Sequence, residues 1–148
     1  AVCQDNEIDL AVVADWFYQL YKDYKIKLLY CGYDQRFSKD WIERMSMYGW
    51  TREGKELEMV LQNAATLNNA LRLVEADLKS RLINYNENPV DRWNFKNSCL
   101  KMDDKRQALC IKMNDENKID GSVTLIGVYE MFRRHKSEFL SRVNKKGK

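Results

Sequence analysis

Residues 117–123 read Asn-Lys-Ile-Asp-Gly-Ser-Val and join a polar loop to the longest apolar run in the second half of the chain. The apolar residues that follow recur at helical spacing, so we predict that a helix begins beside Asp120. A carboxylate at a helix N-terminus is stabilised by unpaired N–H groups and by the helix dipole. Gly121 has no side chain, so backbone or a ligand can approach closely. Asp120 is therefore either a helix cap or a fixed anionic ligand, and the motif alone favours the cap.

The composition indicates one folded domain. The chain has 148 residues, of which 45% are hydrophobic and 11% aromatic, which is enough for a sizeable core and argues against disorder. It has no apolar stretch long enough to span a membrane and no signal-peptide pattern. A net charge of +3 is too small to imply nucleic acid by itself. Basic residues gather late, so we expect a solvated basic tail over about residues 136–148, with nonspecific phosphate contact as the alternative.

The cysteine pattern disfavours a zinc site. The four cysteines include no Cys-x-x-Cys pair, and His135 is the single histidine. Structural zinc needs about four clustered nitrogen or sulfur ligands. Cys31 and Cys110 lie in apolar runs and are predicted to be buried free thiols, which fits a reducing, intracellular setting. Basic neighbours make His135 a poor base for a Cys-His or Ser-His-Asp nucleophile.

The hydrophobic periodicity predicts helices that alternate with short strands. Expected helices cover residues 9–24, 38–48, the stretch around 67–78, a segment starting at Pro89, and 119 to beyond 139 with a break near Ser137. Expected strands cover 26–34, 57–62, 81–85, and a hairpin of 99–102 and 108–113. Asp9, Ser38 and Asn88 are the expected N-terminal caps, and Gly49 is an expected helix stop. This alternation indicates an α/β fold in a single domain.

Asp34 ends the apolar strand predicted at residues 26–34. A continuous apolar strand is typical of a buried, parallel position in a sheet. In open α/β sheets, binding sites form outside the carboxyl ends of the strands. Asp34 is therefore a candidate ligand, although an aspartate after a strand is also ordinary turn chemistry.

A combination of motifs in the second half resembles a known family. The chain carries Asn88-Pro89-Val90-x-Arg92-Trp93, then Asn97, a hairpin containing Lys112, and Lys118-Ile119-Asp120-Gly121. This order resembles the C-terminal nuclease domain of tailed-phage terminase large subunits. The earlier elements come in the same family order, so the resemblance extends over nearly the whole chain to about Arg134.

The resemblance implies an α/β ribonuclease H-like fold, with a mixed sheet flanked by helices and a late β-hairpin. It implies an endonuclease that cuts double-stranded DNA with Mg²⁺ or Mn²⁺ during genome packaging in the host cytoplasm. It also implies the terminase small subunit and the portal as partners of the full-length protein, and no membrane. The family's metal ligands come from a first strand, a later strand end and the start of a late helix. Asp34 matches the second of these and Asp120 the third, so we expect the two acids to share one rim of the sheet.

The sequence departs from the family at its start. The family's first acid lies on a strand before the helix that matches residues 9–24, and here only about eight residues precede that helix. Asp5 and Glu7 are misplaced for that strand, and the chain has no Gly-x-x-x-x-Gly-Lys-Ser/Thr motif. We therefore expect a partial nuclease domain with an incomplete two-metal site, inactive as an isolated piece and prone to self-association.

Two other functions stay open. One is a different ribonuclease H-like nuclease, such as a junction resolvase. The other is a non-catalytic assembly module whose acids are only caps and turns. Lys118 is a possible DNA-phosphate contact or a solvated loop lysine. Asp103 and Asp104 are a charged hairpin tip or a further metal ligand, and Arg92 and Trp93 are predicted to pin their helix to the sheet.

Overall fold

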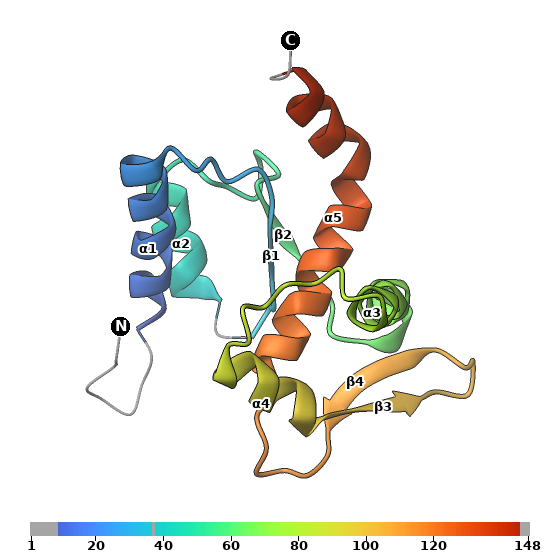
Figure 1. Cartoon of the computed structure of the whole chain (residues 1–148). Helices are drawn as coiled ribbons and strands as arrows, with labels where there is room; N and C mark the ends of the chain where they lie inside the picture. The colour runs from blue at the N-terminus through green and yellow to red at the C-terminus, as the bar shows by residue number, and fades with distance from the viewer. Residues whose placement is uncertain (1–8, 37, 146–148) are drawn as a thin grey trace. The chain divides into compact units, whose positions relative to one another are not determined.

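The computed structural model describes residues 9–36 and 38–145 (Figure 1). Its contacts divide the chain into two compact units, Ala1–Val60 and Leu61–Lys148, and each unit is described by itself. The expectation of a single domain stays a prediction. In the part of the chain that is described, no helix is both long and apolar enough to cross a membrane.

Two helices and a pair of parallel strands form the first unit. They are α1 (Leu10–Tyr24), β1 (Cys31–Tyr33), α2 (Lys39–Met47) and β2 (Leu57–Met59). The Asp9 carboxylate caps α1 by accepting the N–H of Ala11 at 2.8 Å, as predicted. The predicted parallel strand is present but shorter, because only residues 31–33 pair with β2. Its parallel direction places the carboxyl ends of β1 and β2 at the same edge.

Aromatic and apolar side chains bind α1 and α2 to this strand pair. Ala14, Trp41, Met45, Trp50 and Leu57 form the buried cluster, and α1 lies beside α2 (Figure 1). Burial raises the pKa of the Cys31 thiol to about 11, as suits a free thiol in an apolar setting.

Gly49 ends α2 as predicted. It has a φ of 84°, and its N–H donates to the carbonyl of Ser46 at 3.0 Å. The N–H of Trp50 reaches back to the carbonyl of Met45 at 3.2 Å, which completes a Schellman motif. The predicted capping role of Ser38 is wrong. Its hydroxyl donates to the carbonyl of Gln35 at 3.1 Å and makes no bond to the first turn of the helix.

Three helices and a hairpin form the second unit. They are α3 (Ala64–Lys79), α4 (Pro89–Asn97), β3 (Ser98–Met102), β4 (Ala108–Lys112) and α5 (Asp120–Lys145). Helix α3 packs against α5 and β4, and its buried residues are Leu67, Ala70, Leu71 and Val74. Asn88 caps α4 by accepting the N–H of Val90 at 2.9 Å, as predicted. The predicted hairpin is confirmed, with Ser98 paired to Lys112 and Met102 to Ala108.

The hairpin is closed at its base by α4. The carbonyl of Asn97, the last residue of α4, accepts the N–H of Met113 at 2.9 Å. The side chain of Asn97 then reaches past the hairpin to the carbonyl of Lys118 at 3.2 Å. The chain therefore leaves α4, makes the hairpin, and returns to the same place before α5 begins.

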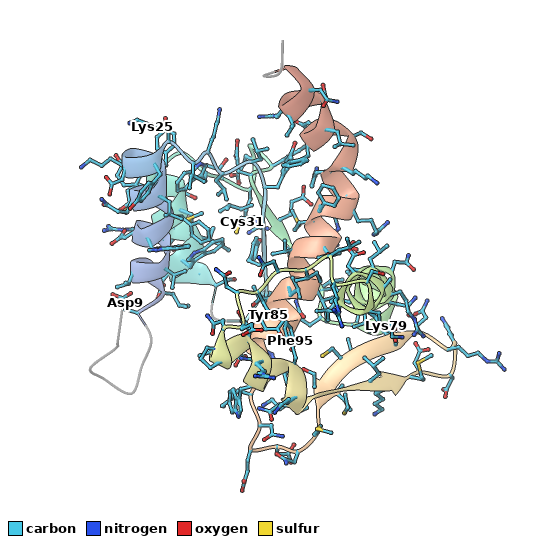
Figure 2. All side chains as sticks on the ribbon, in the orientation of Figure 1. Asp9, Lys25, Cys31, Lys79, Tyr85 and Phe95 are labelled. Carbon is cyan, nitrogen blue, oxygen red and sulfur yellow. The ribbon has the colours of Figure 1, made fainter. Side chains whose placement is uncertain are left out.

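The strand predicted at residues 81–85 is absent, because this stretch forms a loop. Arg81 has a φ of 56°, which a strand does not accommodate. Tyr85 instead turns its ring edge toward Phe95, with ring centroids 5.4 Å apart (Figure 2). This contact joins the loop to α4.

Helix α5 runs without a break through Lys145, so the predicted break near Ser137 is wrong. Residues 136–145 of the predicted basic tail are helical, and residues 146–148 lie outside the described part. Two contacts within this part of the helix support the extension. Arg142 forms an ion pair with Glu138, and the rings of Phe132 and Phe139 meet edge to face at 5.5 Å.

Candidate functional site

Asp120 is the first residue of α5, and its carboxylate is exposed. The carbonyl of Ile119 accepts the N–H of Val123 at 3.0 Å, which places Ile119 at the cap position. Among the described residues, the Asp120 carboxylate takes part in no hydrogen bond or ion pair. It does not cap the helix, which removes the alternative that the motif alone favours.

Asn94 of α4 supplies the missing cap. Its Oδ1 accepts the N–H of Gly121 at 3.0 Å, and its Nδ2 donates to the carbonyl of Val90 at 2.9 Å. The side chain is 4% exposed, so both ends of a buried amide are satisfied. A Cβ on Gly121 would lie 3.1 Å from the Cγ of Asn94, closer than ordinary contact. The close approach predicted at Gly121 is therefore made by a side chain of the neighbouring helix.

Two further polar contacts hold the start of α5 against α4. The Asn97 amide donates to the carbonyl of Lys118, as described above. The hydroxyls of Ser98 and Ser122 lie 2.8 Å apart, and the Ser98 oxygen lies 2.9 Å from the carbonyl of Asn94. Asn97 and Ser122 are also buried. Sequence reasoning missed Asn94 and Ser122, although two asparagines three residues apart on a helix could have indicated a polar face.

Lys118 and the hairpin tip were the other candidates in this unit. The Lys118 side chain is exposed, while its carbonyl is held by Asn97. Asp103 accepts the N–H groups of Lys105 and Gln107 at 2.9 and 2.7 Å, so it shapes the hairpin turn. This supports the hairpin-tip interpretation of Asp103. Trp93 is 47% exposed, so the anchor of α4 is the pair Asn94 and Asn97 rather than the predicted Arg92 and Trp93.

Buried charged and phenolic groups fix the middle of α5. Glu130 is 1% exposed and accepts hydrogen bonds from Arg133 and Arg134. Burial raises the pKa of Glu130, but the hydrogen bonds and charges of the two arginines together lower it below its usual value of 4.5. Tyr129 donates to Asp77 of α3 at 2.7 Å, and burial followed by this bond raises the pKa of Tyr129 to about 12. The Tyr129–Asp77 bond ties α5 to α3 within the second unit, and the Glu130 bonds lie within α5.

Asp34 directly follows β1 in the first unit, at the carboxyl edge of the parallel pair. Its Oδ1 accepts the N–H of Arg36 at 3.1 Å, which forms a turn after the strand. The side chain is exposed. One carboxylate oxygen therefore serves the turn, and the group keeps further lone pairs for a ligand.

The described residues contain no group of three or more metal-binding side chains of the His, Cys, Asp or Glu type. Asp5, Glu7 and Cys3 lie outside the described part of the chain. Asp34 and Asp120 belong to different units, so the expectation that they share one rim stays a prediction.

Residues 7–136 match the family described as "Terminase large subunit, endonuclease domain". This chain belongs to that family. The family region extends over both units and ends within α5. It contains Asp34, the contacts of Asn94 and the start of α5.

A solved terminase structure has a fold similar to that of this chain. The chain is similar to the crystal structure of the HK97 bacteriophage large terminase, with a TM-score of 0.69 and 15% identity. The match covers 84% of this chain and 25% of that one, so the chain spans a quarter of the length of that terminase. This similarity confirms the predicted α/β, ribonuclease H-like fold. The predicted mixed sheet is not formed by the described strands, because the parallel pair β1–β2 and the antiparallel pair β3–β4 are separate sheets. A comparison with curated proteins finds no match.

Proposed function

We propose that this chain is part of the metal-dependent endonuclease of a phage terminase large subunit, which as a full-length protein cuts double-stranded DNA during packaging in the host cytoplasm. The observation that carries the proposal is the exposed carboxylate of Asp120, which no cap or ion pair occupies within the described residues. It lies in the region matched to the terminase endonuclease family. An acid without a structural partner at a helix start is available to a ligand.

Asp34 and Asp120 are proposed to supply carboxylates to the divalent metal ions. Mg²⁺ keeps several waters and is commonly held by one or two carboxylates together with substrate phosphates. Exposed aspartates therefore fit its donor chemistry without a protein cage. When bound, the ions would act as Lewis acids on the scissile phosphate and would lower the pKa of a bound water.

Lys118 is the proposed phosphate contact. Its exposed ammonium adds a positive point charge two residues before Asp120. The hydrogen bond from Asn97 to the Lys118 carbonyl fixes the backbone from which this side chain extends. In the full-length protein, the terminase small subunit and the portal are the proposed partners that bring DNA to this surface.

The test is plasmid nicking by the full-length protein, measured with and without Mg²⁺ or Mn²⁺. We expect Asp120→Asn and Asp34→Asn each to abolish metal-dependent cutting, because each removes a charged oxygen ligand. Asp40→Asn is the matched control, since Asp40 is also an exposed aspartate in the first turn of a helix. The control should cut at the parent rate. Full metal-dependent cutting by Asp120→Asn would overturn the proposal.

A further inference from the structure

Helix α5 takes its side-chain cap from a neighbouring helix, unlike α1 and α4. α1 and α4 are capped by side chains from their own ends, Asp9 and Asn88. The first N–H groups of a helix have no partner inside it, and such a side chain normally satisfies one of them. Ile119 at the start of α5 has no polar side chain that could do so. Asn94 satisfies the N–H of Gly121 from the neighbouring helix instead.

We propose that Asn94 is a positioning residue for Asp120, and this inference rests on the proposed function. Asn94 takes the capping role that an aspartate at a helix start would otherwise be expected to fill. The Asp120 carboxylate is thereby left unengaged while the adjacent N–H is fixed at 3.0 Å. Asn94 on α4 therefore fixes the backbone at the start of α5, and the Asp120 side chain on α5 does not have to act as the cap.

The Asn94 side chain is itself held at both ends. Its Nδ2 donates to Val90 one turn earlier in α4, so the amide cannot rotate without losing a bond. A Cβ on Gly121 would lie 3.1 Å from the Cγ of Asn94, so the glycine allows the amide to lie this close to the start of α5. Residues that orient a metal ligand typically change metal affinity by about 10–100-fold when mutated.

The measured quantity is the Mg²⁺ concentration that half-saturates the full-length protein, read by isothermal titration calorimetry without DNA and also by plasmid nicking. We expect Asn94→Ala to raise this concentration about tenfold or more, because the first turn of α5 loses its cap and Asp120 its fixed direction. Asn94→Asp keeps an oxygen that can accept the N–H of Gly121. Because it loses the donor to the carbonyl of Val90, it should bring the half-activating concentration only part of the way back to the parent value.

Asn68→Ala is the matched control. The Oδ1 of Asn68 accepts the N–H of Ala108 at 2.9 Å, so the control also loses one asparagine bond to the backbone of another element. That bond lies at the loop end of the hairpin, opposite the end where Ser98 pairs with Lys112. Asn68→Ala should leave the Mg²⁺ dependence unchanged even though it lowers the melting temperature.

The outcomes separate the two proposals. If Asp120→Asn cuts normally, the proposed function fails. If Asp120→Asn is inactive but Asn94→Ala has the same Mg²⁺ dependence as Asn68→Ala, the positioning inference alone is overturned. Should Asn94→Ala fail to fold, Gly121→Ala gives the answer, since its Cβ displaces Asn94 without removing it. An unchanged Mg²⁺ dependence in a folded Gly121→Ala protein would also overturn the inference.

Discussion

The Oδ1 of Asn94 accepts the N–H of Gly121 at 3.0 Å, and the Cγ of the same side chain lies 3.1 Å from the position that a Cβ on Gly121 would take. Glycine is normally unfavourable inside a helix because it gains backbone freedom on unfolding. At Gly121 the missing side chain has a packing reason, whereas Gly127 of the same helix has no atom within 4 Å of the corresponding position. The two glycines therefore give a matched comparison.

We predict opposite effects of alanine at these two positions. Gly127→Ala should stabilise the protein by about 0.5–1 kcal/mol, the usual gain in a helix. Gly121→Ala should destabilise it by about 1–3 kcal/mol, because the contact with Asn94 must be relieved. Urea denaturation of both variants and the parent measures the difference. Equal stabilisation by both substitutions would mean that Asn94 moves aside without cost.

Asp120→Asn should change the free energy of unfolding by less than about 1 kcal/mol without metal, because only a weak helix-dipole interaction is lost. The fold should stay intact, as judged by circular dichroism. Denaturation with excess chelator is the measurement. A loss of about 1 kcal/mol or more would restore the interpretation of Asp120 as a cap.

Glu130→Gln should flatten the acid dependence of stability. The folded-state pKa of Glu130 lies below its usual 4.5, so its contribution is present above about pH 4.5 and is lost as the pH falls through the lower folded value. The variant should lose about 1.5–3 kcal/mol at pH 7, typical of hydrogen bonds to a charged group. Unfolding free energies measured from pH 3 to 7 test this. A parallel curve for parent and variant would contradict the assignment.

Tyr129→Phe should reduce the loss of stability in alkali. The folded pKa of Tyr129 is about 12 against a usual value of 10, so the contribution of the neutral phenol is present below pH 10 and is lost between pH 10 and 12. The variant lacks the bond to Asp77 and should show a shallower decline over this range. Thermal melts from pH 8 to 12 measure it. An unchanged slope would show that another group causes the decline.

Helix positions were the part of the fold best predicted from sequence, because periodicity and caps are local signals. Asp9 and Asn88 cap the starts of their helices and Gly49 ends another, as expected. The strand expected at residues 81–85 was wrong because its apolar residues have no strand partner, and Tyr85 contacts Phe95 instead. The break expected near Ser137 was wrong because α5 continues through it. Phe132 contacts Phe139 about two turns later, and Glu138 pairs with Arg142 on the next turn.

The local structure around Asp120 was predicted in part, and the metal-binding role of Asp34 and Asp120 stays a prediction. The sequence identified Asp120 and Gly121 as a unit, but it could not show which group approaches the glycine. That group is Asn94, 27 residues away. A contact between two helices separated by a hairpin leaves no local pattern, so capping by a neighbour looks like an absence of capping. For the same reason, the motif alone favoured Asp120 as the cap of the helix that it begins.

The hairpin whose base is closed by Asn97 has a consequence for changes in chain length. The carbonyl of Asn97 accepts the N–H of Met113, and its side chain donates to the carbonyl of Lys118 just before α5. Residues 98–112 therefore form a branch of the chain that starts and ends beside Asn97. The turn at residues 103–107 lies at the far end of this branch and is largely exposed. Insertions or deletions there alter the reach of the branch without changing the path from α4 to Asp120. In this chain, a change in the length of the turn at residues 103–107 should therefore leave the start of α5 in place.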